Sequence, residues 1–184
     1  LAVALSRVFR ADECPGFDPH AYIRHSIAAG LAARGLAQIC GRNPELAFAG
    51  GFLHDIGKLV LASCFASHYA AALSYREQHD CTLIVAERDI LGLDHSVVGG
   101  ILAGAWRFPP SLLSAVAEHH SPSAATADSL ADLIHLADAI ALGLGKTTAN
   151  GELVMPVNPT SWRRLGLDSG KIAQVLPIVV DGMD

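Results

Sequence analysis

The chain has 184 residues, of which 51% are hydrophobic and 17% are charged, and its formal net charge is −5 at pH 7. This length suits one domain of ordinary size or two small ones, and the hydrophobic content excludes an intrinsically disordered chain. The acidic balance, with a pI near 5.9, gives no support to nucleic-acid binding. No apolar run approaches the length that crosses a bilayer, so we expect no membrane partner.

The N-terminal segment begins with residues 1–9, LAVALSRVF, which are apolar but lack the basic start and the cleavage site of a signal peptide. We interpret them as the edge of a longer protein. Residues 20–40 follow with apolar positions at helical period and are predicted to form the first helix. Asn43 is a typical N-cap for a second helix over residues 44–53, which begins with a proline.

Helical patterns continue along most of the remaining chain. Asp94 is a typical N-cap for a helix at residues 95–106. Pro109 and Pro110 open the next helix, and a glycine stops the helix at residues 128–142. The stretch TLIVAER has β-branched residues, yet it shows neither strand alternation nor a hairpin partner, and NGELVMPVNPTSW is loop-like. The further helices are predicted at residues 66–80, 82–91, 95–106, 110–121 and 128–142. We therefore expect a single all-α domain, with a short C-terminal appendage from about residue 160.

The four cysteines contain no C-x-x-C pair, which excludes a zinc ribbon or a thioredoxin-type motif. Cys40 and Cys64 have apolar neighbours and are predicted to be buried free thiols. Free thiols suit a reducing compartment, so we expect a cytoplasmic protein.

Histidines and aspartates within apolar helical segments are the most informative feature of the sequence. Core helices avoid such residues unless a partner compensates them, because burying an unpaired polar group costs free energy. Imidazole and carboxylate ligands suit iron, manganese, zinc or nickel better than calcium, and helices of a bundle can bring them together. The residues concerned are His25, His54, Asp55, His95, His119, His120 and Asp138.

Each of these residues also has an interpretation without a metal. A single helical histidine is more often hydrogen-bonded than a ligand, and His119 and His120 could form a solvated helix end. Asp138 could pair with His135, which lies one turn earlier. The remaining histidines, His20, His68 and His79, have polar surroundings and are expected at the surface.

Asp55 and Lys58 are the candidate catalytic residues. A carboxylate flanked by other ligand candidates can bridge two metal ions, and such pairs of ions hold a phosphate while activating water. Lys58 lies three residues after Asp55, on the same helical face, where its ammonium group would hold a phosphate or another anion. A salt bridge between the two residues is the plainer alternative.

Five segments, in order, resemble the HDOD family, a branch of the HD metal-dependent phosphohydrolase superfamily. They are RHSIA, HDIGK, GLDHSVVGGILAGAW, FPPSLLSAVAEHHSP and LIHLADAIA. The resemblance covers residues 1–145 and implies an all-α, HD-domain-like helical bundle with a metal centre in its core. We expect residues 146–184 to form a C-terminal appendage packed on this domain. Members of this family usually have an additional helical lobe before the part of the domain that corresponds to residue 1 of this chain. We therefore expect the N-terminal lobe to be truncated.

The resemblance assigns roles to the polar residues by their place in these segments. A first metal would be held by His25, His54, Asp55 and Asp138. Asp55 would bridge to a second metal, with Lys58 facing a phosphate. The remaining ligands of that second metal would be His95, His119 and His120.

Two functions follow from the resemblance as expectations. The first is a bacterial signal-transduction output or regulatory domain that retains one or two divalent transition-metal ions and binds a signalling-protein partner. The alternative is a metal-dependent phosphohydrolase acting on a nucleotide or another phosphate ester. A relic pocket filled by histidines remains the plainest interpretation.

Overall fold

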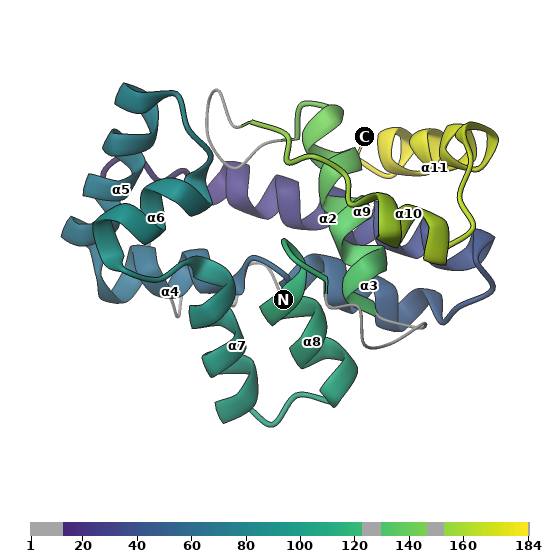
Figure 1. The fold of residues 1–184 in the computed structure, drawn as a ribbon, viewed down its shortest axis with the longest axis horizontal. Helices are drawn as coiled ribbons and strands as arrows, with labels where there is room; N and C mark the ends of the chain where they lie inside the picture. The colour runs from purple at the N-terminus through teal and green to yellow at the C-terminus, as the bar shows by residue number, and fades with distance from the viewer. Residues whose placement is uncertain (1–12, 123–129, 147–152, 184) are drawn as a thin grey trace.

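The computed structural model describes residues 13–122, 130–146 and 153–183, and helices are the only regular secondary structure in these ranges (Figure 1). The fold is all-α, as predicted. The helices are α2 (Pro19–Ile39), α3 (Pro44–Leu53), α4 (Ile56–Cys64), α5 (Ala66–His79), α6 (Leu83–Leu91), α7 (His95–Ala105), α8 (Pro110–Glu118), α9 (Leu130–Gly143), α10 (Pro159–Arg164) and α11 (Ser169–Asp181).

Helix α2 connects two apolar clusters that lie at opposite sides of the molecule (Figure 1). Its C-terminal half contributes Leu36 to a cluster with α9 and α11, which includes Leu133 and Val175. Its N-terminal half contributes Tyr22 to a cluster with α4 and α5, which includes Tyr69. Burial of these apolar side chains holds the helices around a common middle, where the polar candidates lie.

The break between α3 and α4 falls at His54 and Asp55, directly after the predicted end of the second helix at residue 53, and helix α4 itself was not predicted. The Asn43 side chain caps α3 by accepting hydrogen bonds from the backbone N–H groups of Glu45 and Leu46, which confirms the predicted N-cap. The stretch Pro44–Cys64 is long and apolar enough to cross a membrane, but 67% of its most apolar window is buried inside the protein. Such burial is typical of a core helix.

Two helices of the C-terminal segment were not predicted. Residues 153–158 are irregular, but α10 begins at Pro159 and its N-cap is Asn158. This Asn-Pro pair repeats the signal that opens α3, so the sequence contained the evidence. Helix α11 packs on α2 and buries Val175 and Val179, which supports our proposal that residues 146–184 belong to the same domain.

The cysteine prediction was wrong in part. All four cysteines are free, but Cys64 is exposed and Cys40 is only half-buried. Cys64 is the last residue of α4, where the helix ends and its neighbours no longer cover the side chain. The predictions for residues 1–9 and for the start of the last predicted helix, residues 128–129, lie outside the described residues.

Replacing Asp94 with alanine is expected to destabilise the fold by about 1–2 kcal/mol. The buried Asp94 carboxylate caps α7 through the backbone N–H groups of Ser96 and Val97 and pairs with Arg88 at 2.7 Å. Urea unfolding would measure the loss. Asp168→Ala is the matched control, because that exposed cap binds only one backbone N–H group and should cost less. Equal losses would contradict this account of Asp94.

Candidate metal centre

Seven potential metal ligands from five places in the chain converge between the two apolar clusters. They come from α2, the break between α3 and α4, the start of α7, the end of α8, and α9. Within each of two groups, the ligand atoms lie within 4.8 Å of one another. One group is His25, His54 and Asp138, and the other is Asp55, His95, His119 and His120.

The first group has the spacing of a coordination shell. His25 Nε2 lies 3.3 Å from His54 Nε2 and 3.2 Å from Asp138 Oδ1. Asp55 Oδ2 completes the group at 3.6 Å from His25 Nε2 and 3.4 Å from His54 Nε2. Donors that each lie about 2.1 Å from one ion are separated from one another by about 3.0–3.4 Å. The observed spacings therefore fit a metal ion.

The second group faces the other oxygen of Asp55. Asp55 Oδ1 lies 3.2 Å from His95 Nε2 and 3.6 Å from His119 Nε2. His95 Nε2 in turn lies 2.8 Å from His120 Nε2. The two oxygens of Asp55 thus face different groups, which is the arrangement a bridging carboxylate needs.

Backbone carbonyls orient three of the histidines. A carbonyl oxygen only accepts, so Nδ1 carries the proton in each case and Nε2 keeps its lone pair for a ligand. Contacts of this kind are typical of histidines that bind metals. They join His25 Nδ1 to Lys146 O at 2.6 Å, His54 Nδ1 to Gly51 O at 2.7 Å and His119 Nδ1 to Val116 O at 2.9 Å.

Glu87 orients the fourth histidine, and the sequence analysis missed it. Its fully buried carboxylate accepts hydrogen bonds from His95 Nδ1 at 2.6 Å and from the His95 backbone N–H at 2.9 Å. Burial opposes a charge on His95, but Glu87 and Asp55 outweigh it and raise the pKa of His95 to about 10. Helical period alone could have placed Glu87 on the buried face, because it lies four residues after Leu83 and three after Ile84, which are both in the core.

The charge states of Asp55 and His119 suit a cation. Burial opposes ionisation of Asp55, yet His54 and Lys58 hold its pKa well below its usual range. Burial lowers the pKa of His119, which favours the neutral imidazole that metals bind. Asp55 Oδ1, His119 Nε2 and His120 Nδ1 are buried and make no hydrogen bond. Such unsatisfied atoms are costly unless something else binds them, so the residues present fit a metal.

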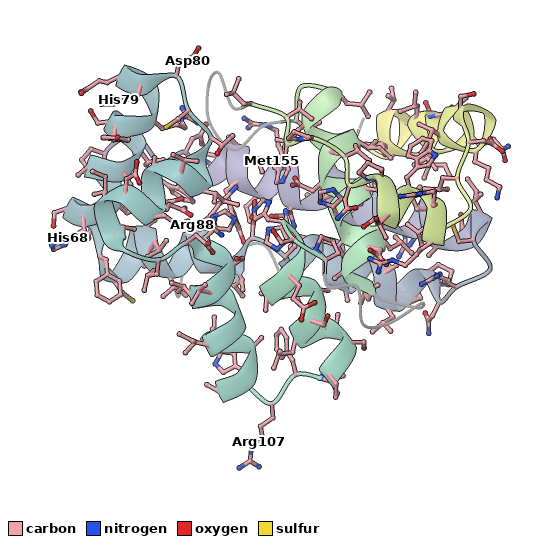
Figure 2. The ribbon with its side chains drawn as sticks, in the orientation of Figure 1. His68, His79, Asp80, Arg88, Arg107 and Met155 are labelled. Atoms are coloured by element: carbon pink, nitrogen blue, oxygen red, sulfur yellow. The ribbon has the colours of Figure 1, made fainter. Side chains whose placement is uncertain are left out.

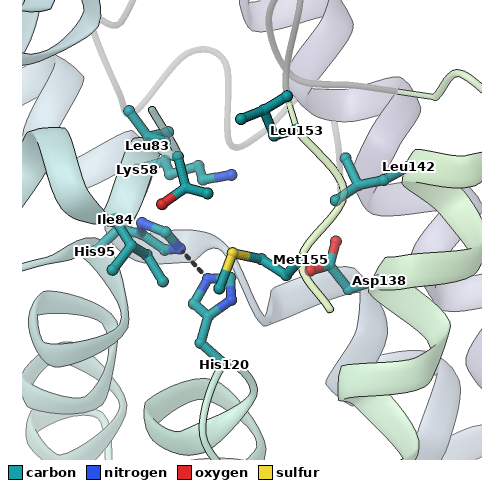
Figure 3. Close-up of a pocket in the computed structure, with 10 residues that line it drawn as sticks. Lys58, Leu83, Ile84, His95, His120, Asp138, Leu142, Leu153 and Met155 are labelled. Carbon is teal, nitrogen blue, oxygen red and sulfur yellow. Dashed lines mark hydrogen bonds between the residues drawn. The ribbon is translucent and has the colours of Figure 1, made fainter. Parts of the chain in front are cut away.

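Lys58 lies at the edge of this centre, where α4 begins. Its Nζ is 2.7 Å from Asp55 Oδ2, and the residue is only 4% exposed. It also lines a pocket of about 330 Å³, measured out to the open mouth. Figure 3 shows Lys58 on one side of the pocket, with His95 and His120 at its base and Asp138 across it.

Other residues that the sequence analysis considered lie elsewhere. Asp138 does not pair with His135, because the His135 ring binds the carbonyl of His119 and the backbone N–H of Asn158. His68 and His79 point outward from the periphery, as expected (Figure 2). His20 is exposed as well.

The model of the HDOD domain family matches residues 1–122 of this chain. Solved structures also match. An HDOD domain protein of unknown function from Geobacter sulfurreducens is 19% identical, with a TM-score of 0.75, and the match covers 99% of this chain and 59% of that one.

Two further structures carry names that bear on function. The MmoQ response regulator from Methylococcus capsulatus Bath is 26% identical, with a TM-score of 0.65 and coverage of 89% of this chain and 63% of that one. A candidate phosphohydrolase from Shewanella amazonensis SB2B is 24% identical, with a TM-score of 0.63, and the match covers 90% of this chain and 66% of that one. The chain thus spans about three fifths to two thirds of the length of these proteins.

Proposed function

Because this chain belongs to the HDOD family, we propose that it is a cytoplasmic, bacterial signal-transduction output or regulatory domain that retains a transition-metal centre. The observation that carries the proposal is the convergence of six ligand side chains around Asp55, whose two oxygens face different groups of them. The response regulator among its structural relatives supports a signalling-protein partner. Carboxylate and imidazole donors favour iron, manganese, zinc or nickel.

In this proposal the two groups hold one ion each. His25, His54 and Asp138 would bind the first, His95, His119 and His120 the second, and Asp55 would bridge them. Glu87 would keep His95 in position through its Nδ1. When bound, divalent ions supply Lewis acidity and lower the pKa of a water molecule to about 7.

Phosphoester hydrolysis is a second candidate function, favoured by the placement of Lys58. Its ammonium group lies in the pocket wall beside the ligand groups. There it would attract a phosphoryl group as a point charge and hold it next to the centre. The apolar part of the pocket wall would keep bulk water away and so strengthen this attraction.

Elemental analysis of protein purified without a histidine tag tests the metal centre. About two transition-metal ions per chain are expected, one for each ligand group. One ion would restrict the centre to a single group. No ion after reloading under reducing conditions would overturn the proposal and leave a helical signalling scaffold with a relic pocket.

Replacing Lys58 with alanine is expected to leave the metal content unchanged and to weaken phosphate binding. A charge-assisted contact contributes about 1.5–3 kcal/mol, which corresponds to a loss of about 10-fold or more. Calorimetric titration of the metal-loaded protein with inorganic phosphate would measure it. Lys171→Ala serves as control, because Lys171 lies on α11 and binds Gly166 O. Unchanged phosphate affinity in Lys58→Ala would exclude this role.

A further inference from the structure

His135 connects a ligand residue of the candidate metal centre to the C-terminal segment. It lies on α9, is buried, and belongs to neither ligand group. Its Nδ1 lies 2.8 Å from the carbonyl oxygen of His119, and its Nε2 lies 2.9 Å from the backbone nitrogen of Asn158. A carbonyl oxygen only accepts, so Nδ1 carries the proton and Nε2 accepts from the Asn158 N–H. One tautomer of His135 therefore satisfies both contacts.

The contact with His119 falls where α8 ends. His119 is the C-cap of α8, and the carbonyl groups in the last turn of a helix have no partner within the helix. The His135 ring supplies a donor for this one. Since His119 and His120 are adjacent and both belong to the second ligand group, a shift of this turn would displace two ligands together.

The contact with Asn158 falls where α10 begins. Helix α10 lies beside α9 (Figure 1), and Asn158 is its N-cap. One turn before His135 on α9, the buried Asp132 carboxylate accepts a hydrogen bond from Ser161 Oγ at 2.5 Å and pairs with Arg164. Helix α9 thus holds α10 at two points, and at one of them the holding residue also contacts a ligand residue.

The C-terminal part of the chain also supports the first ligand group. The carbonyl oxygen of Lys146, three residues after the end of α9, lies 2.6 Å from His25 Nδ1. One ligand histidine in each group is therefore held from this part of the chain, His25 by Lys146 directly and His119 by Asn158 through His135.

We infer that His135 is a positioning residue that couples the second ligand group to α10. A metal ion held by His119 and His120 would fix the end of α8, and the His135 ring would pass this order to the start of α10. Coupling between two sites is reciprocal, so metal binding and the docking of α10 would stabilise each other. The inference rests on the proposed metal centre and adds a route by which a loaded centre changes the C-terminal segment of an output domain.

Two substitutions of His135 separate its two contacts. The amide nitrogen of asparagine takes the place of Nδ1, whereas the amide oxygen of glutamine reaches the place of Nε2. His135→Gln should therefore lose the donor to His119 and bind one of the two ions about 10-fold more weakly, a loss typical of residues that support a ligand from outside. His135→Asn should keep that donor and bind both ions as the wild type does. Titration with Zn²⁺ in competition with a chromophoric chelator would measure these affinities.

Hydrogen exchange of the backbone amides of residues 160–167 measures the coupling without any substitution. In the wild type, Zn²⁺ should slow this exchange about 5-fold or more. Both His135 variants should lose this dependence on metal. Asp132→Asn is the matched control, because Asp132 holds α10 but contacts Ser161 and Arg164 instead of a ligand residue. Its α10 should exchange faster, and Zn²⁺ should still slow the exchange.

Either of two results would overturn the inference while the metal centre stands. One is equal Zn²⁺ affinity in the wild type and in His135→Gln, and the other is wild-type exchange in α10 that Zn²⁺ leaves unchanged. If a His135 variant does not fold, the wild-type exchange measurement decides. If elemental analysis finds no ion in the wild type after reloading, the proposed centre fails and this inference fails with it.

Discussion

Asp55→Asn is expected to reduce the metal content from about two ions per chain to near zero. The two Asp55 oxygens face the two ligand groups, so this one change removes a charged ligand from both. The side chain keeps its size, and the fold should survive. A metal that binds only the folded state stabilises that state by about 2.7 kcal/mol when its concentration is 100 times its Kd. The variant should therefore lose this stabilisation together with the metal. Elemental analysis and thermal unfolding would measure both effects.

The control for this variant is Asp132→Asn. Asp132 is equally buried, but its carboxylate binds Ser161 and Arg164 and so connects α9 to α10. It lies outside both ligand groups. Asp132→Asn should therefore lower stability without loss of metal, and a chelator should shift its melting temperature as it shifts that of the wild type. Two ions retained in Asp55→Asn would refute the bridge.

Gly57→Ala is expected to destabilise the protein by about 3 kcal/mol or more, because overpacking against backbone cannot be relieved by a side-chain rotation. A Cβ at Gly57 would overlap the carbonyl oxygen of His95 and lie 2.8 Å from the Gly99 backbone nitrogen. Helices α4 and α7 would have to separate. Since α7 carries His95, the second ligand group should lose its metal before the first does.

Gly143→Ala is the matched control for this substitution. A Cβ at Gly143 meets no atom within 4 Å, and alanine favours the helix. Unfolding in urea and metal titration of the two variants would separate the effects. A Gly57→Ala protein with wild-type stability and two tightly bound ions would show that the contact between α4 and α7 tolerates displacement.

Local signals predicted most of the secondary structure. The caps at Asn43 and Asp94 depend on residues adjacent in the chain, and both were confirmed. The missed helix α10 begins with the same Asn-Pro signal, so that error came from weighing a short segment too lightly. The error at Cys64 had another source, because apolar neighbours in sequence do not reveal how far a helix end is covered.

The seven polar residues of the centre were recognisable from sequence because histidine and aspartate are out of place in apolar helices and because their segments resemble a family. The sequence therefore determined the fold class and the identity of the candidates. Only the tertiary structure decided which oxygen of Asp55 faces which group, that Glu87 supports His95, and that Met155 lines the pocket beside Lys58. These contacts join residues on different helices or segments, and their distances follow from how the helices pack rather than from any local pattern.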